Sequence, residues 1–185
     1  MILKRFLFNV KEDINIIEFK NVQIIKKEAF YQDNTVDYLK FDDKLQIVEE
    51  SASEECKNLQ IIEIGENEFI NSNEVSRSSE DEIDKKVFIG KEEEIQCTDE
   101  LVFQAKAFYN CSKLHTVILP NAKNITIEKD AFSGCTALRT VVFGLGVVKI
   151  HDQSFVGCTN VRFVCLSGST ADKFAREQKI KVINV

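Results

Sequence analysis

The chain of 185 residues is long enough for one domain with a substantial buried core. Its 44% apolar and 29% charged residues are ordinary for a globular protein and exclude wholesale disorder. Its net charge of −6 argues against a nucleic-acid partner, because nucleic-acid binders present a basic face. We expect no membrane insertion either, since no apolar run approaches the roughly 18 residues of a membrane span.

Residues 1–21 are predicted to form an N-terminal cap. Phe6, Phe8 and Val10 alternate along the chain, and "NIIEF" predicts an early strand. The first apolar patch is too short for a secretory signal, and no small-residue cleavage site follows it. As written, the chain is therefore expected to stay in the cytoplasm. A true start further upstream would make it a secreted or cell-surface protein.

A pattern of about 23 residues occurs twice in residues 22–64 and three times in residues 101–167. A small residue marks position 0 of each copy: Ala29, Ala52, Ala107, Ala131 and Ser154. Position 1 carries Phe30, Ser53, Phe108, Phe132 and Phe155. Position 4 carries Asp33, Cys56, Cys111, Cys135 and Cys158. Position −4 is also apolar, with Ile25, Val48, Phe103, Ile127 and Ile150.

An alternating apolar pair at positions 10 and 12 predicts one short strand in each copy. The pairs are Leu39/Phe41, Ile62/Ile64, Val117/Leu119, Val141/Phe143 and Val164/Leu166. A unit of this size cannot bury its own apolar face, so neighbouring units must stack and share one core. The sequence therefore predicts a solenoid in which the stacked strands form a parallel sheet.

Between the two groups of repeats lies an acidic stretch. Residues 65–82 are predicted as an acidic insertion and residues 83–100 as a degenerate repeat, in which "IDKKVF" resembles "IKKEAF" and "IEKDAF". The alternative is that residues 66–100 form one irregular excursion. Net charge differs along the chain: it is −4 over residues 1–64, −8 over 65–100 and +6 over 101–185.

Residues 168–185 are predicted to form a C-terminal cap made of a helix and a strand. Ser169 and Asp172 resemble a capping box, which predicts a helix over about Thr170–Gln178. The alternation in "IKVINV" predicts a last strand.

These features resemble the BspA-like leucine-rich repeat family, whose repeat reads roughly I-x-x-x-A-F-x-x-C-x-x-L-x-x-I-x-I-P. The resemblance covers about residues 22–64 and 83–185, and it departs from the family at Asp33 and Ser53. It implies a leucine-rich-repeat solenoid without catalytic residues. Members occur in host-associated bacteria and some protists, often at cell surfaces, and are thought to bind proteins.

The six cysteines do not require disulfides. The four at position 4 fit a buried column of free thiols, whereas Cys97 and Cys165 lie off this column and are expected to be more reactive. We expect no metal site, because His115 and His151 stand in different repeats and no C-x-x-C occurs. We also expect no cofactor and no enzymatic activity, since no phosphate loop or nucleophile pair is present.

The strand face that points away from the core is the predicted binding surface. In the last three repeats, positions 8, 9 and 11 place an apolar line beside a basic one, which is typical of an interaction site. The candidate partner-binding residues are His115, Thr116, Ile118, Arg139, Thr140, Val142, Arg162, Phe163 and Cys165. The sequence favours a non-enzymatic protein-binding module. The alternative is a structural or adhesive surface protein that self-associates weakly through its solenoid ends.

Overall fold

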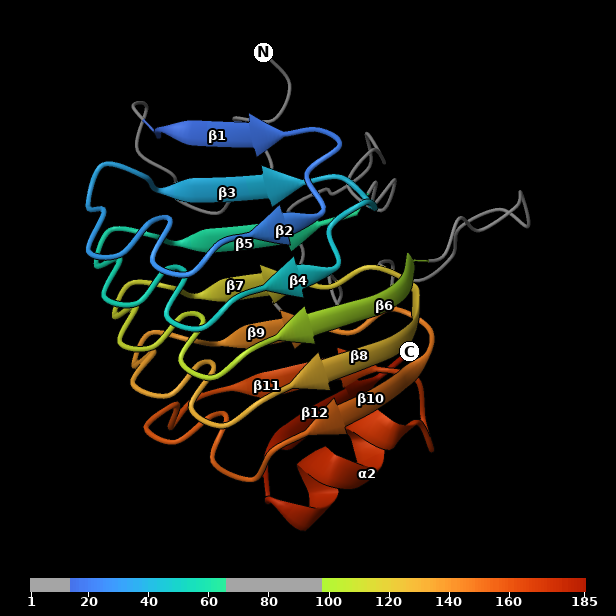
Figure 1. The fold of residues 1–185 in the computed structure, drawn as a ribbon. Coiled ribbons are helices and arrows are strands. Elements are labelled where there is room, and N and C mark those ends of the chain that lie inside the picture. The colour runs from blue at the N-terminus through green and yellow to red at the C-terminus, as the bar shows by residue number, and fades with distance from the viewer. Residues whose placement is uncertain (1–13, 66–97) are drawn as a thin grey trace, which may run out of the picture.

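The computed structural model describes residues 14–65 and 98–185, which coil into a solenoid with two parallel β-sheets (Figure 1). The seven-stranded sheet runs in the order β1 (Ile16–Phe19), β3 (Tyr38–Phe41), β5 (Ile61–Ile64), β7 (Thr116–Ile118), β9 (Thr140–Val142), β11 (Arg162–Cys165) and β12 (Lys181–Asn184). The five-stranded sheet runs in the order β2 (Ile24–Ile25), β4 (Ile47–Val48), β6 (Thr98–Phe103), β8 (Ala122–Ile127) and β10 (Val147–Ile150). The predicted leucine-rich-repeat solenoid is confirmed.

The seven-stranded sheet contains the strands predicted from the alternating apolar pairs. In the first four repeats, both members of each pair point into the core and are buried. Successive strands pair in parallel without slippage, as in Leu39↔Ile62↔Val117↔Val141. Stacking these residues in register removes each apolar side chain from water, and this burial is the main stabilising contribution in such a fold.

The five-stranded sheet was not predicted. Its strands contain the apolar residues of position −4, of which Ile25, Val48, Phe103 and Ile127 are buried in the same core. Two of these strands, β2 and β4, contain only two residues each, which is too short to show a period in the sequence. A single apolar position per repeat does not show the alternation by which strands are recognised.

A tight turn joins each strand of the five-stranded sheet to the next strand of the seven-stranded sheet. In the fourth repeat, Asp130 and Gly134 have φ angles of 58° and 77°. The N–H of Phe132, at position 1, donates to the carbonyl of Ser154 in the following repeat (2.9 Å). The N–H of Gly134, at position 3, donates to the carbonyl of Val156 (2.8 Å). The first four turns are each hydrogen-bonded in this way to the turn that follows.

Two ladders of side chains run through the core along the solenoid axis. The rings of Phe108, Phe132 and Phe155 stack at centroid distances of 5.4 Å, with interplanar angles of 9° and 7°. Beside them, each thiol of position 4 donates to a carbonyl of the preceding repeat; the four are Cys56, Cys111, Cys135 and Cys158. Ser53 interrupts the ring ladder, and its buried hydroxyl has no hydrogen-bond partner among the described residues.

The early and late repeats are direct neighbours in both sheets. β4 pairs with β6 and β5 pairs with β7. Of the predicted insertion (65–82) and degenerate repeat (83–100), only Gly65 and residues 98–100, which begin β6, belong to the described part of the chain. Phe6, Phe8 and Val10 of the predicted N-terminal cap also lie outside it, whereas "NIIEF" forms β1 as predicted.

The C-terminal cap has the predicted helix and strand. Helix α2 (Thr170–Glu177) begins after Ser169, whose hydroxyl accepts from the N–H of Asp172 (3.2 Å). Asp172 in turn accepts from the N–H of Gly168 (2.8 Å) and from Nε of Arg176 (2.9 Å). α2 packs beside β10 at the end of the five-stranded sheet, and β12 extends the seven-stranded sheet beyond β11.

Candidate protein-binding surface

The side of the seven-stranded sheet that points away from the core is called the outer face. It carries two lines of side chains that alternate along each strand with the core positions. Strand register aligns each line across the whole sheet. The first line contains Ile16, Tyr38, Ile61, Thr116, Thr140, Arg162 and Lys181. The second contains Glu18, Lys40, Glu63, Ile118, Val142, Val164 and Ile183.

On β3 and β5 the outer face is closed. Tyr38 and Glu63 are 1% and 2% exposed, and the tyrosine hydroxyl donates to the glutamate carboxylate. Burial raises the pKa of Tyr38, and this hydrogen bond adds to the rise. Lys40 completes the cluster with an ion pair to Glu63 at 3.6 Å. Because Tyr38 and Glu63 are bonded to each other and buried, the outer face offers little accessible surface on β3 and β5.

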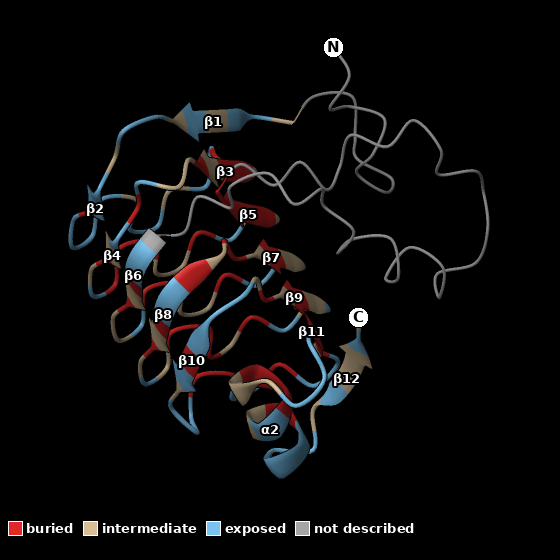
Figure 2. Cartoon of the chain, turned by 90° about the vertical axis from the view of Figure 1, so that its right-hand side faces the viewer, coloured by how far each residue is buried: buried red, intermediate tan, exposed pale blue. Residues whose placement is uncertain are grey.

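On β7 and β9 the outer face is open. Ile118 and Val142 lie opposite each other on these neighbouring strands, and both are partly exposed. Thr116 and Thr140 form a parallel pair beside them, also partly exposed. Figure 2 shows the difference, with β3 and β5 mostly buried and β7 and β9 partly of intermediate exposure. The accessible apolar strip therefore begins at β7 and consists of Ile118 and Val142.

Positive charge borders this strip. Arg139 is exposed just before β9, and Arg162 lies partly exposed on β11, where its Nε donates to the hydroxyl of Thr140 (3.3 Å). Lys181 follows Arg162 in the first line and is exposed. Burial lowers the pKa of His115, and the positive charge of Arg139 lowers it further. The histidine therefore stays neutral near pH 7, and the charge of the border comes from the two arginines and the lysine.

Two of the predicted surface residues point the other way. Phe163 and Cys165 were expected on the outer face, but they are 0% and 1% exposed and belong to the core. β11 is shifted by one residue, so that Phe163 pairs with Val141 and Val164 with Val142. Four consecutive apolar residues, Phe163 to Leu166, gave no alternation by which to choose the register. The expected reactivity of Cys165 is corrected too, because burial raises the pKa of its thiol.

The structure adds residues to the surface that sequence reasoning missed. β12 pairs with β11, which places Lys181 next to Arg162 and Ile183 next to Val164. The strand itself was predicted, but its place beside β11 depends on how α2 folds back, and no local pattern encodes that. The other predicted surface residues keep their outward or border positions: His115, Thr116, Ile118, Arg139, Thr140, Val142 and Arg162.

Neither a metal-ligand cluster nor a membrane-spanning helix is found among the described residues. Residues 14–65 and 98–185 hold no group of three or more His, Cys, Asp and Glu side chains that could bind a metal ion. In the same ranges, no helix has the length and apolarity that a membrane crossing needs. Cys97 lies outside them.

The sequence profile of the BspA type leucine rich repeat region matches this chain over residues 2–92 and 81–181, with six copies of the repeat. That family suggests a protein-interaction or surface-adhesion role, and its members are typically non-enzymatic. Among solved structures, the crystal structure of the pneumococcal vaccine antigen PcpA is similar in fold, with a TM-score of 0.54 and 14% identity. The match covers 91% of this chain and 41% of that one. No curated protein sequence matches this chain significantly.

Proposed function

Because this chain belongs to the BspA-type leucine-rich repeat family, we propose that it is a non-enzymatic module that binds a protein on the outer face of β7 and β9 and at the charged residues that border it on β11 and β12. One observation supports the proposal above all. The outer face is closed on β3 and β5, whereas on β7 and β9 it presents the partly exposed pair Ile118 and Val142. Accessible apolar side chains with a polar or charged border are typical of protein interfaces.

The sheet would act as a rigid platform. Hydrogen bonds between strands fix Ile118, Val142, Thr116 and Thr140 at the strand spacing of about 4.8 Å. β-branched side chains also have few rotamers to lose on docking. A partner that covers this strip therefore pays little conformational entropy on the solenoid side, and more of the buried area contributes to affinity.

The border indicates the charge of the partner. Arg139, Arg162 and Lys181 lie along one side of the apolar strip. Such charges attract an acidic partner and orient it during encounter, mainly by raising the association rate. We therefore expect the partner segment to combine apolar side chains with Asp or Glu, and its association to slow as salt is added.

The test is a pull-down from an extract of the source organism, read by mass spectrometry. The wild type is compared with an Ile118→Glu, Val142→Glu variant, which places two charges on the strip. The matched control is Val102→Glu, Thr126→Glu, because this pair also lies opposite each other on neighbouring strands and is also partly exposed, but in the other sheet.

All three proteins must melt at similar temperatures. A partner retained by the wild type and the control, and lost from the strip variant, would support the proposal. Identical sets of bound proteins in all three would refute it.

Self-association through the solenoid ends is the second candidate. Within the described residues, β1 and β12 are the edge strands of the seven-stranded sheet, and each pairs on one side only. Unpaired strand edges are able to recruit another strand. Analytical ultracentrifugation over a range of concentrations separates the candidates, because a mass that grows with concentration would favour self-association.

A further inference from the structure

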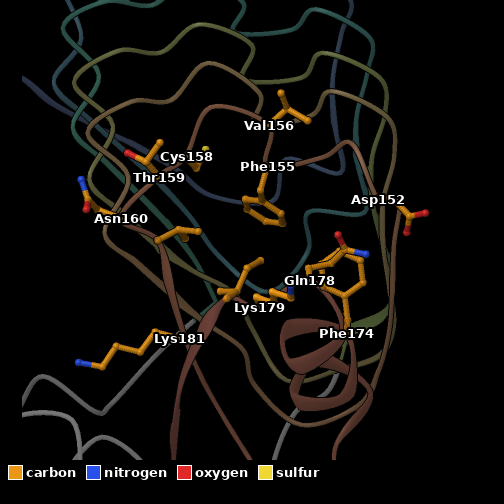
Figure 3. A pocket seen from close by; sticks show the side chains of 12 residues that line it. Asp152, Phe155, Val156, Cys158, Thr159, Asn160, Phe174, Gln178, Lys179 and Lys181 are labelled. Carbon is orange, nitrogen blue, oxygen red and sulfur yellow. The ribbon is translucent and has the colours of Figure 1, made fainter.

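At the C-terminal end of the solenoid the core opens into a hollow of about 560 Å³, which we call the cap hollow. Its volume lies within the roughly 300–1,000 Å³ that is usual for ligand pockets. Phe155 lies near its centre, with Phe174 of α2 on one side and Thr159 and Asn160 on the other (Figure 3). Cys158, Val161 and Ile180 add apolar wall, and Gln178, Lys179 and Lys181 stand at the end of α2 and the start of β12.

The cap hollow exists because the cap completes only two sides of the last layer. β12 continues the seven-stranded sheet beyond β11, and α2 packs beside β10 at the end of the five-stranded sheet. On the third side, the last turn is followed by no further turn among the described residues. The hollow thus corresponds to one missing turn of the solenoid.

The ring ladder ends in this hollow. Phe108 stacks on Phe132 and Phe132 on Phe155, each at 5.4 Å, and Phe163 contacts the edge of Phe155 at 5.2 Å. No described ring stacks on the far side of Phe155. Another flat ring placed at the same spacing would continue the ladder, and stacked rings gain free energy beyond the apolar area that they bury.

The last turn also has backbone N–H groups without an acceptor among the described residues, at the positions where a further turn would provide one. In the preceding repeat, the N–H groups of positions 1 and 3 donate to the carbonyls of positions 0 and 2 in the next turn. The equivalent donors in the last turn are the N–H groups of Phe155 and Gly157, and the described residues provide no acceptor for either. The N–H of Gln153 differs, because Nδ1 of His151 accepts from it (3.1 Å).

From these two observations together, we propose that the cap hollow binds an aromatic turn of another protein. The occupant is a short turn with an aromatic side chain that stacks on Phe155. The backbone carbonyls on either side of this residue accept from the N–H groups of Phe155 and Gly157. Such a segment supplies the missing turn, and it is recognised by ring and backbone rather than by charge. This site is separate from the outer face, so either proposal can fail without the other.

The chain's own preceding turn provides the probe. We would use an acetylated and amidated peptide that copies Lys129–Thr136 with Cys135→Ser, because this turn already stacks on its neighbour in the required way. Binding is followed on ¹⁵N-labelled protein by the amide signals of the residues that line the hollow and of Gly157, which lies between two of them in the chain. We expect saturable shifts at Phe155 and Gly157, with a Kd of about 1 mM for so short and flexible a segment. A peptide with alanine in place of its phenylalanine should bind at least about tenfold more weakly.

A pair of protein variants locates the binding. Thr159→Trp puts a large side chain into the hollow from an exposed lining position, and it should weaken peptide binding at least about tenfold. Thr136→Trp is the matched control, since Thr136 is the exposed residue at the same position of the preceding repeat. The control should bind the peptide like the wild type, and melting curves check that both variants fold.

Three results would overturn the proposal. One is the absence of saturable shifts up to about 10 mM peptide. Another is equal binding of the phenylalanine and alanine peptides. The third is equal binding by the Thr159→Trp and Thr136→Trp proteins, which would place the contact elsewhere on the surface.

Discussion

The ring ladder makes a quantitative prediction about position. Phe132 is fully buried and has ring neighbours on both sides, Phe108 and Phe155, with Phe103 at 5.6 Å. Phe155 is 8% exposed and is one of the residues that line the cap hollow. The same substitution at the two sites should therefore cost different amounts of stability, although the residues are equivalent in the repeat.

Buried Phe→Ala changes cost about 3–5 kcal/mol, and the cost rises when the surrounding structure cannot collapse into the cavity. Phe132→Ala leaves a closed cavity between two rings, so we expect about 5 kcal/mol. Phe155→Ala enlarges a hollow that water already reaches, so we expect about 3 kcal/mol. The difference of about 2 kcal/mol combines one additional ring contact with the closed cavity.

The free energy of unfolding is measured by urea titration followed by circular dichroism, with the slope of the transition compared between variants. Phe132→Leu serves as a control that keeps most of the apolar volume, and it should cost about 1.5 kcal/mol. Equal losses for the two alanine variants, or a larger loss for Phe155→Ala, would refute the reasoning, because the ladder would then not end at an open face.

Four further predictions concern single groups. Burial lowers the pKa of His115 in the folded protein, so the unfolded chain binds a proton more readily and stability falls as pH drops below about 6.5. In a plot of melting temperature against pH, His115→Gln should reduce this fall. Hydrogen bonding from the N–H of Gly168 lowers the pKa of Asp172, so the stabilising contribution of this carboxylate is lost as pH falls below about 4. Asp172→Asn should reduce the loss of melting temperature in that pH range. Ser53→Ala removes a buried hydroxyl without a described partner and should raise stability by about 1 kcal/mol in urea titrations, whereas a lower stability would show that the hydroxyl is paired. The five buried cysteines should resist iodoacetamide in the folded protein and react in denaturant, as counted by mass spectrometry, and fast labelling of any of them in the folded protein would contradict their burial.

The sequence was sufficient for those parts of the fold that repeat. Residues such as Phe132, Cys135 and Leu138 recur at fixed spacing because each must pack on its own equivalent in the next layer, so their periodicity encodes the stack directly. The strands β2 and β4 escaped prediction because two residues are too few to show a period.

The outer face was predicted where alternation was clear, as at Ile118 and Val142. It was misread at Phe163 and Cys165, where alternation fails and the register depends on the neighbouring strand. The cap hollow depends on how far α2 and β12 extend over the last turn, which is a property of tertiary packing and not of any local pattern.

The hydrogen bonds between successive turns have a consequence for evolution. Each inner turn offers the same donors to the following layer and the same acceptors to the preceding one, as Phe132 does toward Ser154. A duplicated unit of about 23 residues inserted between two layers would find both sets of partners in place. The chain could thus lengthen by internal duplication, each copy adding about 4.8 Å along the axis. The outer face would lengthen with every copy, whereas the cap hollow would remain a single feature at the C-terminal end of the stack.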